Sequence, residues 1–438
     1  MARPNPAFCL EIEASADALA QLPALRRELS GRAAIVDHRH SDPARTQFAV
    51  EATTEHHLEE ARRVVEARLG DRLFTCTDRV LELHHGGQVR VRPSRPPEEL
   101  HELERFAAAG VQRVRDLILE DVGRADELTS RASTVALVSD GTAFSCRGTL
   151  QPLAALPSLE RRAVLLNERV DLSAVPLLSD LRCVDNLVEA VVHISAGFAA
   201  VCLADIAAPR CIAVKERLAA RLDIPVVHDA QEPAAIVVLA ALHNALRVVG
   251  KSLASARIVV RGPGPAAAAI VRLLDAAGAA HQTMPGSDAT GISSHQVPSV
   301  RGADALITTG HDVDLKRVIN AMAPDPILFL LADHLDPPVL SELRKRVAVL
   351  ATRSPDEGNC LDWSLAYPGV LRGLLDHHST ELTIEMQFGA ARLLAQGGGA
   401  RLSYKNLLPD ADDPNVVGSI CSAIRVGTCD GPRADVPR

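Results

Sequence analysis

The chain has 438 residues, of which 47% are hydrophobic and 23% are charged, a balance typical of a globular protein with two or three domains. The formal net charge of −8 and the mixed charge pattern provide no basic stripe, which argues against nucleic acid as a partner. No apolar run is long enough to span a bilayer, and no export signal is visible. The nine cysteines form no CxxC pair, which favours reduced thiols. We therefore expect a cytoplasmic protein without a membrane partner.

The first 87 residues are predicted to form one domain. Alternating or β-branched stretches predict strands, and two amphipathic stretches predict helices. In chain order these are strand 7–14, helix 16–29, strands 33–40 and 46–53, helix 55–69 and strand 80–86. This βαββαβ order is typical of a ferredoxin-like fold, and it resembles the ACT type of domain that senses small molecules. A packing or dimerisation module without a ligand remains an alternative.

The next segments are predicted to form a linker and a second domain. The Pro-rich stretch 88–100 predicts the linker. Residues 101–225 then combine helices with short apolar strands at 135–140, 163–167 and 200–205.

The segment 226–426 is predicted to form a Rossmann-like domain. ARIVVRGPGPAAAAIVRLLDAAGA (256–279) combines a strand, a Gly turn and a helix. ADALITTG, PILFLLAD and VAVLATRS then predict further buried strands of a doubly wound parallel sheet. The last residues, 427–438, are predicted to be a disordered tail.

Several long blocks resemble the bacterial NAD(P)-dependent malic enzymes. They are VALVSDGTA (135–143), PLAALP (152–157), DIAAPRC (205–211), LDIPVVHD (222–229), AIVVLAALHNALRVVGK (235–251) and LAYPGVLRGLLD (365–376). The resemblance runs from about 130 to 420, and some members of that family carry an ACT-like front domain. It implies an α/β catalytic domain followed by the Rossmann-like domain. It also implies Mg²⁺ or Mn²⁺, NAD or NADP, and the oxidative decarboxylation of malate to pyruvate.

The metal site that the resemblance implies is degenerate in this sequence. The family takes its ligands from a Glu-Asp pair and from a further Asp. Here the segments read CLADIAAPRC and HDAQEPAA, which put Ala204 and Ala230 at two of these positions and leave only Asp205. One carboxylate is insufficient for a hard divalent cation.

The general base and acid that the resemblance implies are also replaced. Arg162 occupies the position of the family's Lys base, and Asn167 that of the following Lys. An arginine stays protonated and cannot accept the substrate's proton. Ala107 occupies the position of the family's Tyr acid. We therefore expect the parent reaction to be lost.

The dinucleotide fingerprint GPGPAA keeps Gly262, Gly264 and a tolerated Ala267. Pro263 removes a backbone N–H from the turn, and Pro285 stands where an acidic residue is expected for the ribose. We therefore expect neither NAD(P) nor a metal to be bound.

New polar residues stand at other positions of the implied site, which raises the possibility of a rebuilt cleft. Its candidate catalytic residues are Arg162, Asp205, Asp229, Glu232, Asp333 and Asp362. Arg147 and Asn359 are candidates for binding a substrate carboxylate. Carboxylates this close would raise one another's pKa. The alternative, which we favour, is that Glu232 and Pro233 merely cap a helix that no longer binds metal.

Three functions follow from these observations. The first is a catalytically silent homologue that works by binding or regulation, and the family analogy implies that it is a homodimer. The second is a non-redox lyase, decarboxylase or cyclase that acts on a small carboxylated metabolite in specialised metabolism. The third, a working NAD-dependent malic enzyme, conflicts with Arg162, Ala204 and Ala230.

Overall fold

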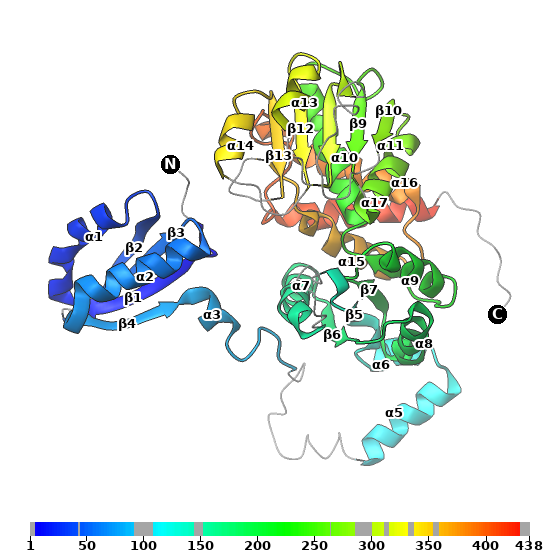
Figure 1. Cartoon of the computed structure of the whole chain (residues 1–438). Helices are drawn as coiled ribbons and strands as arrows, with labels where there is room; N and C mark the ends of the chain where they lie inside the picture. The colour runs from blue at the N-terminus through cyan, green and yellow to red at the C-terminus, as the bar shows by residue number, and fades with distance from the viewer. Residues whose placement is uncertain are drawn as a thin grey trace. The chain divides into compact units, whose positions relative to one another are not determined.

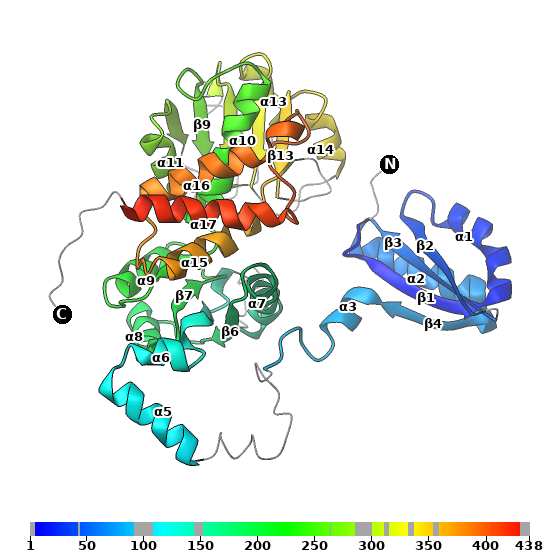
Figure 2. The same ribbon diagram turned by 180° about the vertical axis from the view of Figure 1, so that it is seen from behind.

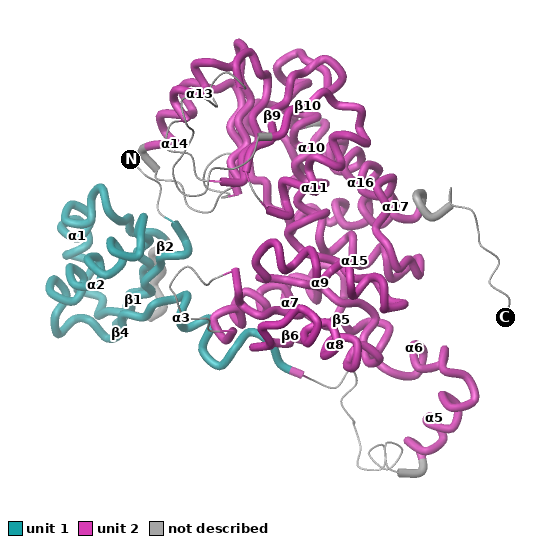
Figure 3. Tube along the Cα trace, turned by 45° about the vertical axis from the view of Figure 1, so that its right-hand side comes forward, with its two compact units in different colours: residues 1–90 teal, residues 91–438 magenta. Residues whose placement is uncertain are grey.

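The computed structural model describes residues 5–42, 44–91, 108–143, 152–262, 264–284, 300–310, 315–331, 337–353 and 359–429. The chain forms two compact units, Met1–Arg90 and Val91–Arg438 (Figure 3). In the described part of the chain, no helix combines the length and the apolar character needed to cross a membrane.

The first unit is a four-stranded antiparallel sheet with two main helices on one face (Figure 1). Its elements are β1 (Cys9–Ser15), α1 (Leu22–Glu28), β2 (Ala33–Asp42), β3 (Arg45–Ala52), α2 (Glu55–Leu69) and β4 (Leu73–Asp78). The strand order is β2-β3-β1-β4. The predicted ferredoxin-like topology is thus confirmed, whereas the ACT type of function stays a prediction.

Alternation in the strands and helical spacing in α2 create the core of this unit. β1 and β3 bury alternate residues, and α2 buries residues three or four positions apart. The core includes Leu10, Ile12, Phe48, Val50, Leu58, Ala61, Val65 and Leu69. β1, β3 and α2 therefore each have one face packed in the core and one face more exposed.

The predicted strand at 80–86 is wrong. The fourth strand is β4, and it is followed by the short helix α3 (Arg79–His84). The carboxylate of Asp78 accepts hydrogen bonds from the backbone N–H groups of Val80 (3.0 Å) and Leu81 (3.2 Å). This N-cap favours a helix over a strand at this point.

The second unit begins with a four-stranded parallel sheet of order β6-β5-β7-β8. The strands are β5 (Thr134–Ser139), β6 (Ser173–Leu178), β7 (Ala200–Leu203) and β8 (Val226–His228). The helices of this part of the chain are α5 (Ala108–Glu120), α6 (Arg124–Leu128), α7 (Leu156–Val170), α8 (Val184–Ile194) and α9 (Arg210–Ala219). α7 packs against β6, and α8 packs against α9.

Two expectations for this region need correction. The predicted strand at 163–167 is part of α7, because Leu159, Ala163 and Leu166 follow helical spacing and are buried together. β8 pairs with β7 in the first sheet. The two sheets therefore divide after β8, slightly beyond the predicted domain boundary at 225.

A six-stranded parallel sheet of order β10-β9-β11-β12-β13-β14 follows. Its strands are β9 (Ile258–Arg261), β10 (His281–Met284), β11 (Ala305–Thr308), β12 (Ile327–Leu330), β13 (Val349–Thr352) and β14 (Asn359–Cys360). The chain winds from β9 to β10 on one side and to β11 through β14 on the other, as in a doubly wound sheet. The predicted Rossmann-like architecture is confirmed.

Helices cover both faces of this sheet (Figures 1 and 2). The helices of this part of the chain are α10 (Glu232–Val248), α11 (Pro265–Ala276), α13 (Leu315–Ala321), α14 (Pro337–Leu343), α15 (Tyr367–Asp376), α16 (Ile384–Gly397) and α17 (Pro414–Cys429). Among them, α15 packs against α17 and α7. α10 is buried along nearly its whole length and packs against α11 and α16. Its Asn244 donates hydrogen bonds to the carbonyls of Ala395 (2.8 Å) and Leu407 (2.7 Å). α17 extends three residues into the segment predicted to be a tail, and 430–438 lie outside the described residues.

Candidate functional site

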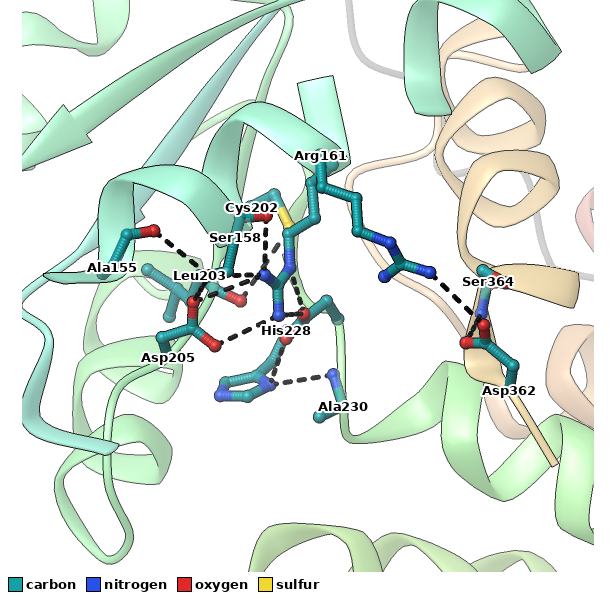
Figure 4. Close-up of polar contacts among 12 residues, drawn as sticks. Ala155, Ser158, Arg161, Cys202, Leu203, Asp205, His228, Ala230, Asp362 and Ser364 are labelled. Carbon is teal, nitrogen blue, oxygen red and sulfur yellow. Dashed lines mark hydrogen bonds and ion pairs between the residues drawn. The ribbon is translucent and has the colours of Figure 1, made fainter. Parts of the chain in front are cut away.

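The candidate site lies at the carboxyl edge of the four-stranded sheet. Asp205 follows β7, His228 ends β8, and Asp229 comes directly after it. Because β7 and β8 are parallel neighbours, their carboxyl ends bring these side chains together. α7 faces them and contributes Arg162 and Ser158, the latter shown beside Asp205 in Figure 4.

The guanidinium of Arg162 lies between the two aspartates. Its Nε donates to Asp229 Oδ2 at 2.6 Å. Its Nη2 donates to Asp205 Oδ1 at 3.1 Å, and its Nη1 donates to Asp205 Oδ2 at 3.3 Å. Nη1 also donates to the carbonyl (2.9 Å) and hydroxyl (3.0 Å) of Ser158. The guanidinium is therefore hydrogen-bonded on every side.

Ser158 completes this arrangement, which we name the Arg162 cluster: Ser158, Arg162, Asp205 and Asp229. The Ser158 hydroxyl donates to Asp205 Oδ2. Ser158 and Arg162 are four residues apart on α7, so they share one face of the helix. The cluster is withdrawn from solvent, since the side chains of Arg162, Asp205 and Asp229 are 16%, 12% and 2% exposed.

Burial and charge shift two pKa values in the cluster. Burial opposes the charge on Arg162, but Asp229 and Asp205 outweigh it and raise the pKa of the guanidinium above its ordinary value. Burial raises the pKa of Asp205, and the Arg162 charge offsets only part of that rise. Arg162 is therefore a permanent cation and cannot act as a proton acceptor.

The backbone at Asp205 is in an unusual conformation. Its φ is 53°, in the left-handed region that favours glycine. The Asp205 carbonyl accepts a hydrogen bond from the Ala143 N–H at 3.1 Å, which holds this turn. Backbone strain of this kind is concentrated at sites where a side chain must be aimed, here toward Arg162.

His228 is buried beside the cluster. Its Nδ1 accepts a hydrogen bond from the Ala230 N–H at 3.2 Å, which places the ring proton on Nε2. Burial lowers the pKa of His228. Within the described residues, neither His228 Nε2 nor Asp229 Oδ1 has a hydrogen-bond partner.

Two further buried groups lie behind the cluster. Burial raises the pKa of the Cys202 thiol to about 12 and raises that of the Tyr367 hydroxyl well above its ordinary value. The negative charge of Asp229 adds to both shifts. Both groups therefore stay protonated at neutral pH.

Two of the predicted cleft residues are occupied elsewhere. Glu232 begins α10 and forms an ion pair with Lys215 of α9, with Arg272 of α11 at 3.9 Å. Asp362 caps a short helical turn through the Ser364 N–H (2.9 Å) and pairs with Arg161 at 3.6 Å. Figure 4 shows the Arg161–Asp362 pair apart from Asp205 and His228. Among the members of the predicted set that the structure describes, it brings together Arg162, Asp205 and Asp229 and leaves Glu232 and Asp362 in other ion pairs.

Asn359 uses its whole amide group to hold the backbone. Its Nδ2 donates to the carbonyls of Leu350 (3.0 Å) and Tyr404 (2.9 Å), and its Oδ1 accepts from the Leu407 N–H (3.0 Å). It has no donor left for a substrate carboxylate. The remaining positions of interest, Ala107, Arg147, Pro263, Pro285 and Asp333, lie outside the described residues.

The described residues do not fit a divalent metal ion. None of them forms a group of three or more His, Cys, Asp or Glu side chains placed to hold one. The two acids nearest to such a position, Asp205 and Asp229, already neutralise a guanidinium. Ala204 and Ala230 supply no oxygen from their side chains.

Two glycines flank the described ends of the turn between β9 and α11, and both have positive φ angles. Gly262 has a φ of 113°, and a Cβ there would lie 2.3 Å from Thr309 Oγ1. Gly264 has a φ of 104° and open space around it, at the start of α11. Ala267 is buried and lets the helix pack closely. A helix N-terminus with open backbone around it can accept a phosphate group.

The sequence analysis did not identify three of the residues that matter here. Ser158 could have been found, because its spacing from Arg162 places both on one face of α7. Lys215 and Arg272 carry no local signal. Their pairing with Glu232 depends on how α9, α10 and α11 meet in the folded chain.

Comparisons with known proteins give a consistent result, although no family model matches the chain. The chain is 34% identical over 352 residues to the NAD-dependent malic enzyme of Geobacillus stearothermophilus, covering 74% of this chain and 73% of that protein. It is 31% identical over 380 residues to the bifunctional malic/malolactic enzyme of Bacillus subtilis, covering 80% and 92%.

The solved structures that resemble this chain also include malic enzymes. The malic enzyme from Pyrococcus horikoshii is 28% identical with a TM-score of 0.72, covering 80% of this chain and 89% of that one. The NAD-dependent malic enzyme from Thermotoga maritima is 27% identical with a TM-score of 0.72, covering 80% and 99%.

Replacement of Arg162 tests the cluster. We expect Arg162→Met to lower the free energy of unfolding by about 3–5 kcal/mol, because it leaves two buried carboxylates without a counter-charge. The neighbouring Arg161→Met is the matched control, since that side chain is 68% exposed and forms a surface ion pair worth at most about 1 kcal/mol. Urea unfolding measures both variants. Equal losses of unfolding free energy in Arg162→Met and Arg161→Met would contradict a special role of Arg162 in the buried cluster.

The buried His228 predicts a pH dependence of stability. Its pKa is lowered in the folded chain from an ordinary 6.5, so the unfolded chain binds more protons at lower pH. The contribution of neutral His228 to the free energy of unfolding is therefore fully present above pH 6.5 and is lost as the pH falls through the pKa of the folded state. We expect the melting temperature of His228→Gln to fall less steeply with falling pH than that of the unaltered chain. His193→Gln is the control, because that ring is 80% exposed. If the melting temperature of His228→Gln fell with pH as steeply as that of the unaltered chain, His228 would not be the source of this pH dependence.

Proposed function

The chain belongs to the malic enzyme family, and we propose that it does not catalyse the metal-dependent oxidative decarboxylation of malate. We propose instead that it acts by binding, as a regulatory or partner protein. The observation that carries this proposal is the position of Arg162, whose guanidinium is bound by both Asp205 and Asp229.

The chemistry of Arg162 supports the loss of the proton-transfer step. Oxidation of a hydroxyl requires a base that can take its proton. Arg162 stands at the position of the family's lysine base, and the two aspartates raise its pKa further. A guanidinium of this kind holds its proton at any pH at which the protein is folded.

The charge of Arg162 also opposes a metal ion at this place. Two positive charges about 5 Å from a guanidinium are repelled by roughly 6–7 kcal/mol at an effective dielectric constant of about 20. The two carboxylates that would attract the metal are already paired with Arg162, whose charge cancels one of their two negative charges. The guanidinium thus occupies the electrostatic role that the cation has in the family.

Gly262 and Gly264 of the dinucleotide fingerprint are present in the β9–α11 turn. Gly262 and Gly264 keep the conformation that allows a dinucleotide pyrophosphate to approach the backbone. The named relatives include NAD-dependent and NADP-dependent enzymes. We therefore expect any binding of NAD or NADP to be uncoupled from turnover.

A non-redox lyase, decarboxylase or cyclase is the second candidate, and it has less support. It requires an acidic cleft in which one carboxyl stays protonated and an arginine binds a carboxylate substrate. Glu232 and Asp362 have other ionic partners, and the Arg162 cluster is saturated. One arginine and two aspartates also leave a negative balance when both acids are ionised, which repels a carboxylate ligand.

An activity assay tests the proposal. With malate, NAD or NADP, and Mg²⁺ or Mn²⁺, we expect no reduction of the nucleotide above background, because the base and two metal ligands are missing. The Geobacillus stearothermophilus malic enzyme serves as the positive control under the same conditions. A turnover number of roughly 1–10³ per second would overturn the proposal.

A further inference from the structure

The segment 361–366, which we name the crossover, connects the two sheets of the second unit. It leaves β14, the last strand of the six-stranded sheet, and leads into α15, which packs against α7 beside the four-stranded sheet. Both ends of the crossover are anchored, because the amide of Asn359 holds three backbone groups and Tyr367 is 1% exposed. Between these anchors, Asp362 and Trp363 are only partly buried.

Charged side chains hold the crossover from two directions. Arg161 of α7 pairs with Asp362 at 3.6 Å, and Figure 4 shows its guanidinium reaching from the helix toward that carboxylate. Arg353, directly after β13, has its guanidinium carbon 3.7 Å from the centre of the Trp363 ring. Two adjacent residues of the crossover thus contact two arginines, one from α7 and one from the edge of the six-stranded sheet.

The contact between Arg161 and Asp362 is the kind that salt can break. Its separation of 3.6 Å exceeds that of a direct hydrogen bond. The two side chains are 68% and 32% exposed, so dissolved ions screen their attraction. The neighbouring Arg162 differs, because it pairs with Asp229 at 2.6 Å and that carboxylate is 2% exposed. Adjacent arginines of α7 therefore form one permanent contact and one reversible contact.

We propose that Arg161 and Asp362 form an electrostatic latch, and that its release lets Trp363 move to a more exposed position. When salt screens the pair, Asp362 keeps its hydrogen bond from the Ser364 N–H (2.9 Å) but no longer ties the crossover to α7. An exposed ion pair changes the ratio of two conformations by up to about fivefold.

The position of the crossover gives the latch a consequence for the rest of the unit. Its short helical turn, Trp363–Leu365, packs against α10, the helix that begins beside the Arg162 cluster. The latch therefore sets how α7, α10 and the crossover meet, and it changes the surface that they present together. This inference does not depend on whether the Arg162 cluster is catalytic.

The fluorescence of Trp363 tests the latch, because it is the only tryptophan of the chain. Acrylamide is uncharged, so its quenching of the indole reports exposure at any salt concentration. We expect the quenching constant of the unaltered chain to rise by up to about fivefold between about 0.01 M and about 1 M NaCl, as the screening length falls from about 30 Å to about 3 Å. Arg161→Met should have the higher quenching constant already at low salt and should lose the salt dependence.

Three further variants separate the latch from a general loss of packing. Asp362→Asn should behave as Arg161→Met does, since its amide oxygen can still accept from the Ser364 N–H. Arg161→Lys keeps the charge and should keep the salt response. Arg217→Met breaks an exposed ion pair with Asp185 between α9 and α8, and it should match the unaltered chain. Melting temperatures close to that of the unaltered chain establish that the variants are folded.

Two results would each overturn the latch. One is a quenching constant of the unaltered chain that does not change with salt. The other is an Arg161→Met variant whose quenching constant and salt dependence equal those of the unaltered chain or of Arg217→Met.

Discussion

The ion pair of Arg162 with Asp205 and Asp229 is the interaction on which the rest of the site depends. Two carboxylates follow adjacent parallel strands, and their burial is tolerable only with a cation between them. A metal can supply that cation, and so can a guanidinium. In this chain the cation between the two carboxylates is the guanidinium of Arg162. Arg162 links the turn after β7 to the segment that leads into α10, through its ion pairs with Asp205 and Asp229.

The helical step of α7 separates two adjacent arginines that have different environments. Neighbouring positions on a helix differ by about 100°, so Arg161 and Arg162 point in different directions. Arg162 enters the buried cluster, whereas Arg161 reaches Asp362 at a largely exposed position. At α10, Glu232 is similarly turned away from the cluster toward Lys215. The acidic residues that looked like one cleft in the sequence therefore belong to separate ion pairs.

The fold could be predicted from the sequence because its signals are local. The Gly turn of 256–279 predicts the start of the Rossmann-like domain, and the alternation in β1 and β3 predicts strands of the first unit. The strand predicted at 163–167 was wrong because a short apolar run is compatible with a strand or with one turn of a buried helix. The Arg162 cluster could be anticipated from the replaced ligands. The partners of Glu232 and Asn359 could not, because they lie on elements that are distant in sequence.

The central claim is that Arg162 has taken the electrostatic place of a divalent cation. Titration of the full chain with Mn²⁺, monitored by the electron paramagnetic resonance of the free ion, tests it directly. The account predicts that the free Mn²⁺ signal is the same with and without the protein, while the Geobacillus stearothermophilus enzyme depletes it. Stoichiometric loss of the free signal in the presence of this chain would contradict the claim.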